Sequence, residues 1–217
     1  MRIAHALASV LLIAVLASPA MAQQIGGEIG NLNDPVGSVP NILVGDQSLA
    51  YLVFPGEQVS CPDDGFRLDA VRIWLEFSED QVPVCLSVSG GLLDAVPEGD
   101  GFVPGDPIYL SEPRLIAIND PGLQVIEVFT DEVASCEILE DAYFLTLQFI
   151  GPAEASLGVD DEPAPGIEFI DSGQGYVDLN GFDRPSGGKI IIWGDIICCI
   201  TTPTERSSWH QIKQLFR

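Results

Sequence analysis

Histidine is almost absent from this chain. Of its two histidines, His5 lies close to the N-terminus and His210 close to the C-terminus. Catalysis by a histidine base beside serine or cysteine is therefore excluded from the body of the chain, as are histidine-rich metal sites. A carboxylate pair, as in glycoside hydrolases, is what remains for an enzyme. Glu76, Glu127 and Glu168 lie in expected strands, but so acidic a chain places carboxylates there by chance, so we assign no catalytic residue and expect no enzyme.

Basic residues are also scarce. Nine lysines and arginines stand against 32 aspartates and glutamates, which gives a formal net charge of -23. A field of that sign repels phosphate backbones and anionic lipid headgroups. We therefore expect no nucleic-acid partner and no membrane binding by the body of the chain. The charge alone does not distinguish a solubilising surface from one that binds divalent cations.

Long apolar runs are confined to the first residues. MRIAHALASVLLIAVLASPAMAQQ has an early positive charge at Arg2, an apolar run over 6–17 and small residues at Ala20 and Ala22. This layout predicts a secretory signal peptide over residues 1–22. The alternative, a membrane anchor, is less favoured because the run is short for ~30 Å of hydrocarbon. We expect a secreted protein, whether extracellular, at the cell surface or periplasmic.

Five cysteines follow the signal peptide, and the thiols of an exported chain are expected to oxidise. Two disulfides and one remaining thiol are the simplest outcome. We expect Cys85 to pair with Cys136, and Cys61 to pair with Cys198 or Cys199, which would tie the start of the domain to its last strand. A zinc site is the alternative, but the cysteines have no CxxC spacing and no neighbouring histidine.

Helical periodicity is missing from residues 48–200, where short apolar runs alternate with Gly, Pro and Asp. About ten strands predict an all-β fold, an antiparallel two-sheet sandwich or jelly roll. Residues 23–47 read as an irregular lead-in and 201–206 as a linker. The expected strands are 49–54, 68–77, 82–89, 107–110, 114–118, 123–130, 142–150, 167–170, 175–179 and 189–200.

The stretch RIWLEF carries the best local signal for a binding site. Alternation places an apolar set on one face of the strand, and Arg72, Trp74 and Glu76 on the other. An indole flanked by hydrogen-bonding groups suits a sugar ring, and Trp193 or Tyr176 would extend such a site. The alternatives are that another segment covers Trp74 or that a bulge near residue 70 reverses the phase.

Calcium is the ion that carboxylate-rich loops of an exported protein would suit. Two of the carboxylate-rich loops are 159–166 and 177–183, and no acidic loop of the chain has the EF-hand spacing. We therefore interpret these loops as solvated, and we expect no cofactor. The weak metal candidates are Asp94, Glu98, Asp100 and Asp106.

Four stretches of the chain resemble a known group of proteins. They are DGFVPGDPIYLSEP, GLQVIEVFT, LEDAYFLTLQFIG and FIDSGQGYVDL. Over roughly residues 60–200 the pattern is similar to secreted bacterial β-sandwich domains of largely unassigned function. The resemblance implies a jelly-roll-like sandwich in an extracellular or cell-surface setting, and it implies no catalytic residues.

The ending RSSWHQIKQLFR is similar to the S/T-x-W-x-x-I-K-x-L-F/Y-R ending of secreted bacterial proteins of this kind. Residues 207–217 predict a short amphipathic helix with Trp209, Ile212, Leu215 and Phe216 on one side. Such a short helix is marginal alone, so it needs a surface. That surface is either the acidic body of the chain or an outside receptor, membrane or export machine.

Two functions from different classes follow from these observations. The first is a non-enzymatic extracellular or cell-surface β-sandwich with a structural or adhesive role. The second is a carbohydrate-binding module that uses Trp74, with calcium holding a loop. A two-carboxylate glycoside hydrolase is a remote third reading, because it would need two strand glutamates about 5 to 6 Å apart in an aromatic cleft.

Overall fold

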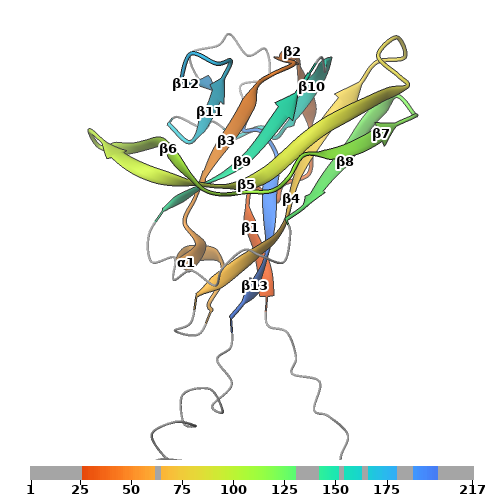
Figure 1. The fold of residues 1–217 in the computed structure, drawn as a ribbon. Coiled ribbons are helices and arrows are strands. Elements are labelled where there is room, and N and C mark those ends of the chain that lie inside the picture. The colour runs from red at the N-terminus through yellow and green to blue at the C-terminus, as the bar shows by residue number, and fades with distance from the viewer. Residues whose placement is uncertain are drawn as a thin grey trace, which may run out of the picture.

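The computed structural model describes residues 26–61, 65–130, 142–151, 154–162, 166–179 and 188–199. Within these ranges, thirteen strands form two antiparallel sheets that pack face to face (Figure 1). The same ranges contain one helix of four residues. The expected all-β, two-sheet architecture is confirmed. No helix in this part of the chain is long and apolar enough to cross a membrane. The predicted linker and C-terminal helix lie outside the described residues.

Sheet A is built around the long strand β4. One side of β4 pairs with β13 and, further along, with β10, while β8 pairs with its other side. β1 extends the sheet beyond β13, and β2 extends it beyond β10. The strands are β1 (Gly26–Gly30), β13 (Ile192–Cys198), β4 (Phe66–Phe77), β10 (Glu154–Val159), β2 (Gly37–Val44) and β8 (Gly122–Phe129).

Sheet B is built around β9 and the long strand β5. Its strand order is β12-β11-β3-β9-β5-β6, and β7 pairs with the first part of β5. The helix α1 (Pro55–Gln58) follows β3 directly. The strands are β12 (Tyr176–Asp178), β11 (Glu168–Asp171), β3 (Ser48–Val53), β9 (Tyr143–Ile150), β5 (Val84–Glu98), β6 (Gly101–Leu110) and β7 (Arg114–Ile118).

The main core lies between the two sheets, and β4 shows how alternation builds it. Val71, Ile73, Leu75 and Phe77 are at most 1% exposed, as the sequence predicts. The register between β4 and β13 shifts where Ala70 meets Asp195, which is the irregularity that could have reversed the phase. This shift lies before the part of β4 in which apolar and polar residues were predicted to alternate. The side chain of Trp74 therefore still points away from the core.

Sheet B also buries part of its other face. Thr146 of β9 faces this side and is only 1% exposed, and it donates its hydroxyl to the Leu49 carbonyl at 2.8 Å. A second apolar cluster lies on this side, in which Phe144 and Phe169 meet edge to face with centroids 5.4 Å apart. Half-buried residues of β6 and β12, including Phe102, pack against the cluster and explain why this side is dry.

The lead-in over 23–47, expected to be irregular, contributes the edge strands β1 and β2, and β10 is a third strand absent from the expected set. β1 is rich in glycine because its backbone lies very close to β13: a Cβ on Gly26 would come within 2.4 Å of the Ile196 carbonyl oxygen. β2 contains Pro40, which an edge strand tolerates because one side needs no ladder donor. In this segment, the glycines therefore indicate closely paired strands, and the proline indicates an edge strand.

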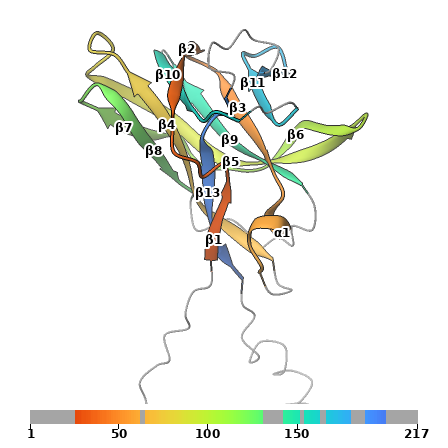
Figure 2. The same ribbon diagram turned by 180° about the vertical axis from the view of Figure 1, so that it is seen from behind.

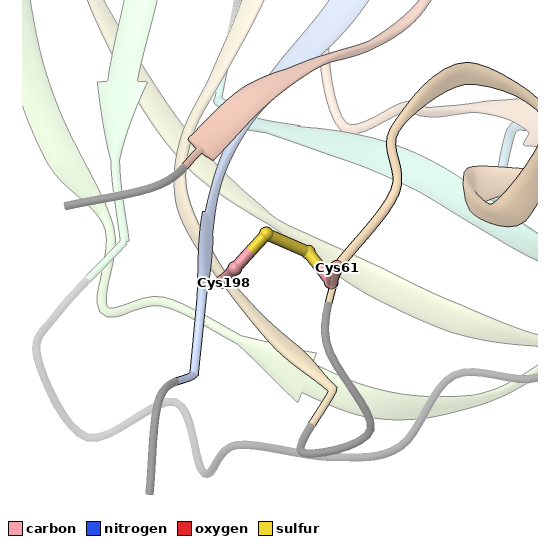
Figure 3. Close-up of a disulfide and its surroundings, with 2 residues drawn as sticks. All are labelled: Cys61 and Cys198. Carbon is pink, nitrogen blue, oxygen red and sulfur yellow. A yellow bond between two sulfur atoms is a disulfide. The ribbon is translucent and has the colours of Figure 1, made fainter. Parts of the chain in front are cut away.

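One disulfide joins the segment after α1 to the last described strand. Cys61, just after α1, bonds to Cys198 at the end of β13, with Cα atoms 5.3 Å apart (Figure 3). This confirms Cys198 as the partner of Cys61 in place of Cys199, which is itself disulfide-bonded. The expected pairing of Cys85 is wrong, because Cys85 is an exposed free thiol that alternation on β5 turns toward solvent. Cys136 lies outside the described residues.

Candidate functional site

The strand β4 presents the predicted trio on the outer face of sheet A. Arg72, Trp74 and Glu76 are each half-buried and alternate with the core residues. Gly158 of β10 lies beside Trp74, and a Cβ on that glycine would come within 2.6 Å of the Trp74 Cβ. The missing side chain on Gly158 therefore makes room for the first carbon of the Trp74 side chain.

A second tryptophan lies on the same face. Trp193 of β13 is half-buried and pairs directly with Arg72 in the sheet register. Its neighbour on β1 is Gly30, which again carries no side chain. The structure therefore places Arg72 between two tryptophans of neighbouring strands. Tyr176, the other aromatic residue considered with them, lies on β12 in sheet B.

Arg72 is held by carboxylates from three other strands. Its Nε donates to Glu127 Oε1 on β8 at 2.6 Å, and its Nη1 donates to Asp195 Oδ1 on β13, also at 2.6 Å. Glu28 Oε1 on β1 is 3.9 Å from Nη1. Because charge-assisted bonds approach from both sides, the guanidinium position is well determined.

Asp195 has a pKa above the ordinary value for an aspartate. Burial raises the pKa most, the Arg72 guanidinium opposes this, and the nearby charges of Glu28 and Glu127 raise it again. Three carboxylates around one guanidinium therefore leave an excess of negative charge at this position of the sheet.

Exposed apolar side chains extend the site along β8. Val125 lies opposite Trp74 and Leu123 lies opposite Glu76, and each is 39% exposed, while Phe129 is 49% exposed. Glu76 accepts a hydrogen bond from the Ser38 hydroxyl on β2, which fixes the carboxylate at the rim. We call this surface the tryptophan face. Its members are Trp74, Trp193, Leu123, Val125 and Phe129, with Arg72, Glu76, Glu127 and Asp195 between and around them.

The three strand glutamates considered for hydrolysis do not form a pair. Glu168 on β11 is completely buried and accepts a hydrogen bond from the Ile190 amide. Glu76 and Glu127 share the tryptophan face, but Glu127 pairs with a position four residues before Glu76, an offset of about 13 Å along the strand. Glycoside hydrolases hold their two carboxyl groups about 5 to 9.5 Å apart.

The weak metal candidates lie along the β5–β6 hairpin, with Asp94 on β5, Glu98 and Asp100 around the turn and Asp106 on β6. Among the described residues, no group of three or more His, Cys, Asp and Glu side chains is arranged to hold a metal ion. The alternative of a calcium-binding loop therefore has no cluster of ligands among the described residues.

Asp160, from another acidic loop, is a structural residue. It is 1% exposed, and its carboxylate accepts hydrogen bonds from the side chains of Asn31 (2.9 Å) and Asn33 (2.8 Å). The backbone amides of Glu162 and Lys189 donate to it at 2.9 Å each. Burial raises the pKa of Asp160, but these four hydrogen bonds outweigh burial and lower it overall. The carboxylate thereby ties the segment after β1 to the loop after β10 and to the segment before β13.

A groove that sequence reasoning missed lies between α1 and the β5–β6 hairpin. Its volume is about 770 Å³, and Phe54, Phe102 and Tyr143 line it together with Glu57 and Asp94. The rings of Phe54 and Phe102 meet edge to face, with centroids 6.1 Å apart. The lining comes from α1, β5, β6 and β9, so no single stretch of sequence indicates the groove.

Comparisons with known proteins support the fold. No family model matches the chain, and no curated protein matches it. A solved structure of the clostridial cysteine protease Cwp84 after propeptide cleavage is similar, with a TM-score of 0.51, 12% identity and coverage of 80% of this chain and 40% of that one. A structure of the cysteine protease and lectin-like domains of Cwp84, a surface layer associated protein of Clostridium difficile, has a TM-score of 0.46 and 13% identity, covering 72% of this chain and 33% of that one. The chain thus spans less than half of each of these two structures, and its likeness to the first of them is one of fold alone.

Proposed function

We propose that the protein is a secreted, non-enzymatic β-sandwich with an adhesive role outside the cell, and that it contacts its partner through the tryptophan face. The observation that carries this proposal is the pairing of Trp193 with Arg72 beside Trp74 on the outer face of sheet A. The Cys61–Cys198 disulfide and the predicted signal peptide support an oxidising, extracytoplasmic setting.

The shape of this surface argues for adhesion. Five large apolar side chains share one sheet face, and three of them are more than a third exposed: Leu123, Val125 and Phe129. Contiguous exposed apolar surface rimmed by polar groups is typical of an interaction site. The tryptophans are the residues most often found at the energetic centre of such sites.

A neutral polysaccharide is the partner that this chemistry fits best. Pyranose rings stack their apolar faces on exposed indoles while their hydroxyls bond to charged or polar groups at the rim. Arg72 and Glu76 are held in place by neighbouring side chains, so they would offer fixed hydrogen-bonding groups. The strongly negative net charge of -23 disfavours an anionic partner.

The same network argues against hydrolysis. Glu127 and Asp195 both bond to the guanidinium of Arg72. A nucleophile or a proton donor must be free to approach the scissile bond, and the guanidinium between these two carboxylates holds both of them in place. The raised pKa of Asp195 is therefore better explained by burial among like charges than by catalysis.

A panel of polysaccharides tests the proposal. The full chain should be retained by at least one neutral polysaccharide, and Trp74→Ala should weaken this retention about tenfold, a loss of about 1.4 kcal/mol. Leu115→Ala is the matched control, because Leu115 is a 76% exposed apolar residue of sheet B. Equal retention of the wild type and of Trp74→Ala would contradict the proposal. A loss of retention in Leu115→Ala as large as the loss in Trp74→Ala would also contradict it.

A further inference from the structure

The groove is lined in part by residues of α1, and the last described strand, β13, ends near this helix. Figure 2 shows α1 and the end of β13 at the same end of the molecule. The Cys61–Cys198 disulfide connects these two places, and Glu57 of the groove is only four residues before Cys61. We propose that the groove binds the chain's own segment 207–217.

The connecting chain is long enough for this contact. The Cα of Cys198 lies 5.3 Å from that of Cys61, and four residues span at most about 14 Å, so Glu57 is within about 20 Å of the strand end. Residues 199–206 can extend over about 26 Å. The tether thus delivers the segment to the groove at a high effective concentration, so a weak contact is sufficient.

The residues that line the groove carry no positive charge, whereas segment 207–217 does. Its residues include two carboxylates and three aromatic rings but no lysine or arginine. Within the described part of the chain, neither Glu57 nor Asp94 has an ion-pair partner. An occupant with apolar side chains and positive charge would complement both features, and cations also interact favourably with aromatic faces.

Segment 207–217 has this chemistry. Its apolar residues fall on one side of an expected helix, while Lys213 and Arg217 supply positive charge in an otherwise acidic protein. A helix of about ten residues is marginal in water, so it gains most of its stability from a surface. Trp209 provides a large side chain for a groove of about 770 Å³.

The tryptophan face is a weaker match for the same segment. Its carboxylates Glu127 and Asp195 already bond to Arg72, and Glu76 already accepts a hydrogen bond from Ser38. A cation there would compete with an arginine that is held in place. Glu57 and Asp94 in the groove, by contrast, form no ion pair with any other described residue.

Zero-length carbodiimide cross-linking of the full chain tests the contact, because the chain has only two lysines, Lys189 and Lys213. Lys189 Nζ lies 2.6 Å from Glu162, so the Lys189–Glu162 cross-link is an internal control for folding and reactivity. We expect Lys213 to join Glu57 or Asp94 in tryptic peptides identified by mass spectrometry. The double variant E57Q/D94N should lose the Lys213 cross-link at least fivefold and keep the control, whereas E98Q, on the same hairpin but outside the groove, should keep both.

Three results would overturn the inference. Cross-links from Lys213 to Glu76, Glu127 or Asp195 would place the segment on the tryptophan face. Cross-links that form only between two chains would identify an intermolecular contact. Absence of any Lys213 cross-link while Lys189–Glu162 forms would mean that the groove does not bind the segment. None of these results depends on the polysaccharide, so the two proposals fail independently.

Discussion

Trp74 and Gly158 are neighbours on adjacent strands of sheet A, and the absence of a side chain on the glycine leaves room for the Trp74 Cβ. A Cβ at position 158 would meet the Trp74 Cβ at 2.6 Å. This relationship explains how the two strands approach each other so closely at Trp74.

Gly158→Ala should therefore displace the indole and destabilise the protein by about 1 to 3 kcal/mol, the usual cost of overpacking. Urea unfolding followed by circular dichroism measures the change. Gly37→Ala, on the edge strand β2 of the same sheet, is the control, because a Cβ there meets nothing within 4 Å. Equal stabilities for the two variants would contradict the packing described for Trp74.

Arg72→Leu should destabilise the protein, because it leaves Glu127, Asp195 and Glu28 facing one another without a cation. The side chain of Arg72 is 24% exposed, so we expect a loss of about 1 to 2 kcal/mol rather than that of a fully buried network. The loss should shrink in 1 M salt, which screens the repulsion. Arg72→Lys should restore only part of it, because an ammonium cannot reproduce the planar fork. A loss that is independent of salt would argue against the electrostatic cause.

Asp160 should contribute stability that depends on pH. Its pKa is lowered in the folded protein, so its contribution is present above the unfolded value of about 3.9 and disappears as the pH falls through the folded pKa. Asp160→Asn should therefore unfold at lower urea than the wild type at pH 7, and the difference should narrow below about pH 4. Asp161→Asn, which alters the exposed neighbour, should unfold like the wild type at both pH values.

The disulfide between Cys61 and Cys198 should be a major source of stability. It closes a loop across a sequence separation of 137 residues, and removing a native disulfide typically costs about 2 to 5 kcal/mol. Cys198→Ser should show this loss in thermal unfolding. Cys85→Ser should change stability by less than about 0.5 kcal/mol, because Cys85 is exposed and free. In the folded wild type, a maleimide should label Cys85, and protection of this thiol would contradict its assignment.

Alternation explains which parts of this fold the sequence predicts well. The outward direction of Arg72, Trp74 and Glu76 follows from local periodicity, and the structure reproduces it. The approach of Trp193 to Arg72 depends on the pairing of β13 with β4, which joins residues 121 positions apart in the chain and leaves no local pattern. The groove escaped prediction for the same reason, since its lining comes from four separate elements.

Glycine explains the largest difference between the expected and the observed strands. Strand β1 reads as a loop because three of its five residues are glycines. In the structure these glycines allow close approach to β13, whose residue Ile196 leaves no room for a Cβ on Gly26. The free thiol at Cys85 is a different case, because cysteine pairing depends on the three-dimensional approach of strands and cannot be deduced from spacing.

Hydroxyl-radical footprinting tests whether the tryptophan face is the binding surface, because tryptophan oxidation reports side-chain accessibility and the chain has three tryptophans. In the free full chain, Trp74 and Trp193 should both be oxidised, since each is half-buried on the outer face of sheet A. Addition of a polysaccharide that retains the protein should protect both tryptophans and leave oxidation of Tyr176 in sheet B unchanged. An unreactive Trp74 in the free protein, or no protection at saturating polysaccharide, would contradict the account.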